Sequence, residues 1–251
     1  MINFIRLRSL MLLLLLVSFL LAPLCALATN ENAMYYKGEM STQSRPQVKA
    51  LDDGLYIGFE LGYDSYRSPV NINASINGDT VSANPVINSS GFVGGIFAGY
   101  GHYFKNILYL AGETYVNGSG AYASYSFNDG ISRSTYNSQI SAGTSFGGAL
   151  LPGIKINDSS LFYLRLGSTW ANVENKESAS SGGNSATVDT KTWTHGIAYG
   201  LGLETAIYKA LSLRTEFTHT DYNNSSYSSF GTFFSPADNQ VMVGLIYHVN
   251  T

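Results

Sequence analysis

This chain of 251 residues contains little charge and almost no cysteine. Its charged residues make up 12% of the sequence, about half the ~25% of an ordinary soluble domain. The formal net charge is only −3 and Lys and Arg form no cluster, so the sequence predicts no nucleic-acid partner. The single cysteine, Cys25, lies near the N-terminus, so the rest of the chain has no disulfide, thiolate metal site or cysteine nucleophile. Glycine and tyrosine are abundant instead, with 26 and 18 residues.

The N-terminal segment has the pattern of an export signal. Arg6 and Arg8 precede an apolar run of thirteen residues, 10–22, and the sequence "ALA" ends at Ala28. A spanning helix needs about 20 apolar residues, so a membrane anchor is the weaker interpretation. Residues 1–28 are therefore predicted to be a secretory signal peptide that is cleaved after Ala28.

Residues 29–53 are polar and show neither helical nor alternating periodicity. They are interpreted as a polar periplasmic N-terminal tail.

From Gly54 onward the sequence alternates between large apolar and small or polar residues. In "GLYIGFELGYDS", which begins at Gly54, the residues with odd numbers are large and apolar: Leu55, Ile57, Phe59, Leu61 and Tyr63. The residues with even numbers include Gly and Glu. This period of two predicts β-strands with one apolar face. The same pattern, cleaner in some segments than in others, predicts eight strands: 54–65, 91–104, 107–116, 140–151, 161–170, 193–208, 211–222 and 239–249.

The connections between these strands alternate in length. Short turns are expected at "KN" (105–106), "NDSS" (157–160) and "KA" (209–210). Long polar segments fill the other connections: 66–90, 117–137, 174–192 and 223–238. Short periplasmic turns and long external loops are typical of outer-membrane barrels. The predicted fold is all-β, an eight-stranded antiparallel up-and-down transmembrane β-barrel over 54–251 with four long external loops.

Seven charged residues lie on the face that carries Gly, Ala and Ser. A barrel of eight strands has an interior just wide enough to be filled by side chains, and unpaired buried charges cost several kcal/mol each. We therefore expect an ion-pair cluster that plugs the barrel interior. Its members are Glu60, Glu113, Lys155, Arg165, Glu204, Arg214 and Glu216. Two alternatives remain: charges that face solvent on a half-exposed sheet, and a catalytic carboxylate pair.

Many aromatic residues occur near strand ends, as expected of the interfacial girdles of a membrane barrel. The predicted girdle residues are Tyr63, Tyr100, Tyr103, Phe104, Tyr109, Tyr115, Trp170, Trp193, Tyr208, Tyr222 and Tyr247.

The sequence resembles the small eight-stranded outer-membrane barrels of the OmpA-like transmembrane and opacity-protein type. The resemblance covers "GLYIGFELGY", the hairpins "GIFAGYGHYFKNILYLAGETYV", "LLPGIKINDSSLFYLRLG" and "GLGLETAIYKALSLRTEFTHTDY", and the closing "QVMVGLIYHVN". Gly244 and Tyr247 match the family's closing strand, and Val249 stands where a second aromatic is usual. The resemblance implies a location in the bacterial outer membrane, contact with membrane lipid and lipopolysaccharide, and insertion by the barrel-assembly machinery. We expect a monomer.

The expected function is non-enzymatic: external loops held by a rigid barrel for adhesion to host or other surfaces, together with envelope integrity. The alternative is a narrow or gated porin-like channel with the Glu/Arg cluster as its constriction. A remote alternative is an enzyme like the lipid A deacylases, which carry His and Ser two apart on one strand. Here Thr220 and Asp221 follow His219, so that serine is missing. No catalytic residue, cofactor or metal is predicted, because the four histidines lack metal-ligand spacing.

Overall fold

The computed structural model describes residues 51–76, 79–83, 86–105, 107–129, 134–181, 184–223, 225–226, 233–234 and 236–249. The predicted signal peptide and nearly all of the predicted tail lie outside these ranges. No helix in the described ranges is long and apolar enough to cross a membrane.

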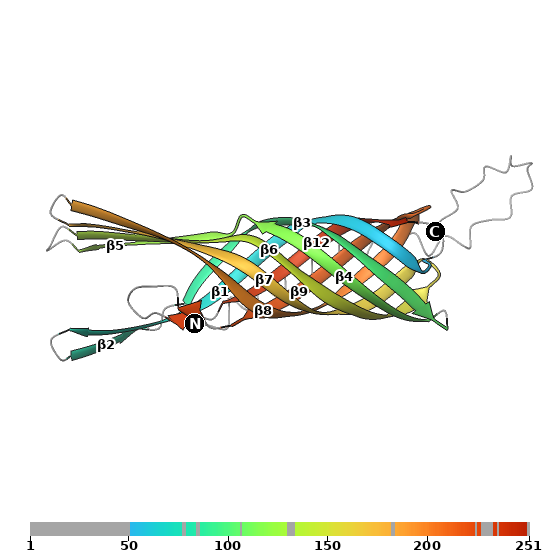
Figure 1. Ribbon diagram of the computed structural model, residues 1–251, viewed down its shortest axis with the longest axis horizontal. Helices are drawn as coiled ribbons and strands as arrows, with labels where there is room; N and C mark the ends of the chain where they lie inside the picture. Colours follow the sequence, from blue (N-terminus) through green and yellow to red (C-terminus); the bar gives the residue numbers. More distant parts are fainter. Residues whose placement is uncertain are drawn as a thin grey trace, which may run out of the picture. The chain divides into compact units, whose positions relative to one another are not determined.

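Eight antiparallel strands pair in a closed ring (Figure 1). Around the ring the order is β1, β12, β9, β8, β7, β6, β4 and β3, and β3 pairs again with β1 through Leu55 and Tyr100. Successive strands of the ring are neighbours along the chain, so the up-and-down barrel predicted from the sequence is confirmed. The ring strands are β1 (Gly54–Ile76), β3 (Val86–Phe104), β4 (Leu108–Ser119), β6 (Ser134–Asn157), β7 (Ser160–Ser181), β8 (Asn184–Tyr208), β9 (Leu211–Tyr222) and β12 (Ala237–Val249).

Much of the chain predicted as polar loops is also β-structure. β7 and β8 remain paired as far as Ser181 and Asn184, and β6 pairs with β7 from Thr135 onward. Four short strands add to these extensions: β2 (Asp79–Ala83), β5 (Tyr122–Asp129), β10 (Ser225–Ser226) and β11 (Phe233–Phe234). Figure 1 shows β5 beside the ends of β6, β7 and β8, beyond the barrel. These extensions could not be predicted from the sequence pattern because backbone pairing outside a membrane does not require an apolar face.

The short turns lie where they were predicted, at the barrel end where β1 begins and β12 ends. Lys105 and Lys209 have positive φ values of 51° and 44°. These left-handed residues suit the tight hairpin turns between β3 and β4 and between β8 and β9.

The two faces of the sheet are separated as the alternation predicts. Along β4 and β9, inward residues are buried and outward residues are exposed or partly exposed. Large apolar side chains cover the outside; Leu61, Ile96 and Ile197 are each more than 60% exposed. Burying such surface in lipid is favourable, whereas leaving it in water is not. The exterior is therefore suited to a bilayer.

The aromatic girdle is smaller than predicted. Tyr109, Tyr115 and Tyr222 are buried, and Tyr103 packs against the buried core cluster. Each of the three buried tyrosines alternates with outward-facing neighbours and so points into the barrel. The remaining predicted girdle residues are exposed: Tyr63, Tyr100, Phe104, Trp170, Trp193, Tyr208 and Tyr247.

Candidate functional site: the ion-pair cluster in the barrel

Six of the seven charged residues singled out in the sequence are buried inside the barrel. Each is at most 6% exposed, and they come from five strands of the ring. They are Glu60, Glu113, Arg165, Glu204, Arg214 and Glu216.

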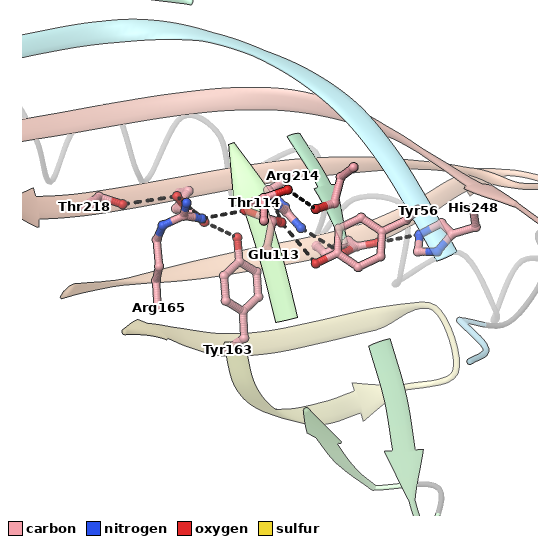
Figure 2. A network of polar contacts seen from close by, with 11 residues as sticks. Tyr56, Glu113, Thr114, Tyr163, Arg165, Arg214, Thr218 and His248 are labelled. Carbon is pink, nitrogen blue, oxygen red and sulfur yellow. Dashed lines mark hydrogen bonds and ion pairs between the residues drawn. The ribbon is translucent and has the colours of Figure 1, made fainter. Parts of the chain in front are cut away.

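Glu113 on β4 is the centre of this cluster. Its Oε1 lies 2.8 Å from Nη1 of Arg165, and its Oε2 lies 2.7 Å from Nη1 of Arg214. The hydroxyl of Tyr56 also donates a hydrogen bond to Oε2 at 3.1 Å. Figure 2 shows both arginines directed toward this one carboxylate. The contacts join β1, β4, β7 and β9 through the interior.

Glu216 completes the partners of Arg165. Nη1 of Arg165 lies 3.2 Å from the Glu216 carboxylate. The Tyr163 hydroxyl donates to Glu216 at 2.6 Å, and the Thr218 hydroxyl donates to it at 3.1 Å. Glu60 lies next to Arg165 and Glu216, with which it lines a common cavity. The carboxylates of Glu113 and Glu216 are thus held by charge-assisted hydrogen bonds, which are stronger than neutral ones.

Glu204 has a histidine partner that the sequence did not indicate. Nε2 of His248 on β12 lies 2.7 Å from Oε1 of Glu204 on β8. Ser212 contacts the same ring nitrogen at 3.1 Å. Arg214 lies farther away, with Nη2 3.9 Å from Oε2 of Glu204. The two partners connect Glu204 to β9 and β12.

Aromatic rings enclose both guanidinium groups. Arg214 lies 4.3 Å from the ring centroid of Phe97, and Arg165 lies 4.5 Å from that of Tyr115. A cation over an aromatic face is stabilised by the ring quadrupole, more so when both groups are desolvated. Tyr115 is in turn hydrogen-bonded to Thr169.

Glycines opposite Tyr163 and Tyr56 provide the space that these two tyrosine rings occupy. A Cβ atom added to Gly202 would lie 2.2 Å from the ring of Tyr163, its partner across β7 and β8. A Cβ atom at Gly99 would lie 2.4 Å from the Tyr56 ring. In these pairs inward glycine makes room for the tyrosines that bind the charged side chains.

Lys155 does not join the cluster. It points inward at the turn end of the barrel, where its Nζ donates to the Leu51 carbonyl at 3.0 Å and lies 5.0 Å from the centroid of Tyr103. Lys155 keeps the regular β6–β7 register, in which it pairs with Leu161, and the pairing shifts only beyond it, toward Asn157. Leu51 itself is buried in the core cluster and donates its backbone N–H to Asp158.

Residues at the end of the predicted tail thus contact the barrel. The Asp53 carboxylate accepts the backbone N–H of Tyr103 at 2.6 Å and lies 2.5 Å from His102. These contacts, with those of Leu51, fasten the segment before β1 to the turn end.

The cavity beside the cluster is small. A cavity of about 10 Å³ lies beside Glu60, Arg165 and Glu216, which is room for one water molecule at most. Arg214 and Glu113 each have only 1% of their side-chain surface exposed. Within the described ranges, no three His, Cys, Asp or Glu side chains converge to hold a metal ion. The arrangement is suited to joining strands and blocking the interior.

A serine and a histidine that are distant in the sequence meet on the outer face. Ser168 Oγ on β7 lies 2.7 Å from Nε2 of His195 on β8, and Asn223 Nδ2 lies 3.3 Å from Nδ1. In this orientation the amide N–H of Asn223 donates to Nδ1, so a neutral imidazole carries its proton on Nε2. That tautomer donates to Ser168, whereas a general base must accept the serine proton.

His219 has different partners. Its Nδ1 lies 2.8 Å from Oδ1 of Asn239, and its Nε2 lies 3.1 Å from Oδ1 of Asp221. The Tyr199 hydroxyl also donates to Asp221, at 3.2 Å. Both histidines lie on the outward face, as the alternation predicts.

A closed ring of strands with an apolar exterior and an ion-paired interior defines a transmembrane β-barrel of the bacterial outer membrane. The chain belongs to the outer membrane protein beta-barrel domain family, whose model matches residues 12–248.

Comparison with solved structures finds other barrels of low sequence identity. Ail, the attachment invasion locus protein of Yersinia pestis, solved in complex with the heparin analogue sucrose octasulfate, is 16% identical; the match covers 78% of this chain and 100% of Ail, with a TM-score of 0.32. Neisserial surface protein A is 14% identical over 76% of this chain and 97% of its own, with a TM-score of 0.36. The outer membrane protease OmpT of Escherichia coli is 10% identical over 83% of this chain and 100% of its own, with a TM-score of 0.46. No curated protein sequence matches the chain.

Proposed function

We propose that the protein is a non-enzymatic surface protein whose barrel holds its external extensions for adhesion to host or other surfaces and for envelope integrity. One observation carries this proposal: β6, β7 and β8 continue as paired strands past the barrel, while the barrel interior is filled by the ion-pair cluster. A stiff scaffold that presents exposed segments is a common basis of binding.

The β7–β8 extension has the features of such a segment. Val188 is 52% exposed on it, and Glu174 lies 3.3 Å from Lys176 and 3.5 Å from Lys191. Hydrogen bonding and charge from these lysines lower the pKa of the Glu174 carboxyl. The lysine across the strands, Lys191, is also the register partner of Glu174. This part of the extension is therefore a paired, polar surface suited to contact with another molecule.

Shortening this extension tests the proposal. Residues 175–190 would be replaced by an Asn-Gly turn, which retains the Glu174–Lys191 pair and suits a two-residue hairpin. Bacteria that display the shortened protein should lose the adhesion to cultured epithelial cells and to plastic that the full-length protein confers. Heat-modifiable migration on gels must remain unchanged, which shows that the barrel still folds. Equal adhesion by the two proteins, at equal surface levels, would contradict the proposal.

A channel is the less favoured function. Solutes would have to displace the contacts between Glu113, Arg165 and Arg214, which fill the interior beside a cavity of about 10 Å³. An open pore requires a continuous water-filled path.

The contact between Ser168 and His195 gives the enzyme alternative a specific test. Lipid A from cells that express the wild-type protein should have the same acyl chains as lipid A from cells that express Ser168→Ala. Loss of an acyl chain only with the wild type would assign an esterase activity and overturn the non-enzymatic proposal.

The remaining partners follow from the family. We propose that the signal peptide is cleaved after Ala28, that the barrel-assembly machinery inserts the chain as a monomer, and that lipid and lipopolysaccharide surround its exterior. N-terminal sequencing of the mature protein should begin at Thr29.

A further inference from the structure

Two aspartates inside the barrel are fully buried and unpaired. Asp64 on β1 and Asp238 on β12 are each 0% exposed, and none of their four carboxylate oxygens has a hydrogen-bond partner. In the described ranges, neither forms an ion pair with a lysine, arginine or histidine. They differ in this respect from Glu113 and Glu216, whose carboxylates are bound by arginines.

The strand register brings these two aspartates close together. Asp64 pairs with Gln240, and Tyr66 pairs with Asp238, across the antiparallel β1 and β12. Since side chains two apart share a face, Asp64 and Asp238 are diagonal neighbours on the inner face. Diagonal neighbours of this kind lie roughly 7–8 Å apart, with side-chain ends closer still. One ion between them can therefore reach both carboxylates.

Neutral polar groups surround the pair. Tyr66 and Gln240 lie beside Asp238, and Ser119 and the Gly91 backbone lie beside Asp64, but none has the geometry of a hydrogen bond to a carboxylate oxygen. The site offers oxygen atoms of several kinds and neither sulfur nor imidazole.

We propose that Asp64 and Asp238 bind a divalent cation, Ca²⁺, between the first and last strands of the barrel. A positive charge between two buried carboxylates that face each other stabilises both, and one divalent ion balances both. Calcium takes six to eight oxygen ligands in flexible geometry, whereas magnesium requires a near-ideal octahedron and zinc favours nitrogen and sulfur. The ion joins β1 to β12 at the end of the barrel from which the external extensions begin.

Calcium titration of the purified, refolded protein in detergent, after removal of divalent ions, tests this proposal. Calorimetry should give a dissociation constant on the order of 10⁻⁴–10⁻³ M, and calcium should raise the midpoint of thermal unfolding. Asp64→Asn and Asp238→Asn should each weaken binding at least tenfold. Glu174→Gln, which changes a partly exposed acid on the β7 extension, is the control and should bind as the wild type does. Magnesium should bind more weakly.

A second measurement on the wild-type protein does not depend on the folding of the variants. Terbium should bind at the same site and emit after excitation of tyrosine, calcium should displace it, and Tyr66→Phe should reduce the emission. The proposal is overturned if the wild type shows neither a heat of calcium binding in calorimetry nor a change in the midpoint of thermal unfolding when calcium is added. It is also overturned if Asp64→Asn stabilises the protein equally with and without calcium, because the carboxylates then share a proton.

Discussion

Glu113 on β4 and Arg214 on β9 meet 2.7 Å apart although their strands lie on opposite sides of the barrel. Four steps around the ring separate β4 from β9 in either direction, so the contact spans the full width of the interior. Arg165 on β7 binds the other oxygen of the same carboxylate. One glutamate thus holds together strands that share no backbone hydrogen bond.

Removing the Glu113 charge should destabilise the barrel strongly. Glu113→Gln leaves Arg165 and Arg214 buried without their shared carboxylate, and breaking a buried ion pair from one side costs about 3–5 kcal/mol. Urea unfolding in lipid vesicles measures the free energy of unfolding. The control is Glu174→Gln on the β7 extension, whose side chain is partly exposed and which should unfold as the wild type does. Equal stability of both variants would mean that the cluster does not hold the barrel together.

The absence of a side chain at Gly202, opposite Tyr163, is also expected to be important for the stability of the barrel. Gly202→Ala places a Cβ atom 2.2 Å from the Tyr163 ring, so the ring and its hydrogen bond to Glu216 must shift. Overpacking of this kind costs about 1–3 kcal/mol. Gly118→Ala is the matched control because a Cβ atom there meets no atom within 4 Å. Gly202→Ala should therefore unfold at a lower temperature than Gly118→Ala. A Gly202→Ala protein as stable as Gly118→Ala would contradict the placement of the Tyr163 ring.

The outward face should tolerate charge only outside the membrane. Leu164 is 47% exposed in the ring part of β7, and Leu164→Arg there should cost about 2–4 kcal/mol in a bilayer. Val188→Arg, at an equally exposed position on the β7–β8 extension, should have little effect. Folding yields and urea midpoints in vesicles test the difference. Equal sensitivity at the two sites would place the extension in lipid or Leu164 in water.

The barrel and most of the cluster could be predicted because a strand has a period of two. Glu60, Glu113 and Arg165 occupy inward positions whatever the detailed register, so alternation alone places them in the interior. Which charges meet depends on how strands are aligned around the ring, and a single sequence does not encode this locally. The same holds for Tyr56, Tyr163 and His248, whose roles follow from contacts between strands far apart in the chain.

Besides the girdle tyrosines, two other predictions failed for physical reasons that are specific to their residues. Lys155 was expected in the cluster, but it lies next to the turn between β6 and β7 and bonds to the Leu51 carbonyl instead. The extensions of β7 and β8 were expected to be loops, because their polar side chains give no alternating pattern to recognise. Ser168 and His195 were separated in the sequence, so only the structure reveals their contact.

The conductance of planar bilayers that contain the purified wild-type protein tests most directly whether the ion-pair cluster closes the barrel. We predict no steady unitary current at moderate voltage, because Glu113, Arg165 and Arg214 fill the interior. Glu113→Ala and Arg214→Ala, if folded, should conduct at least intermittently. Steady unitary currents through the wild-type barrel, abolished by these substitutions, would contradict the account and identify the cluster as the constriction of a channel.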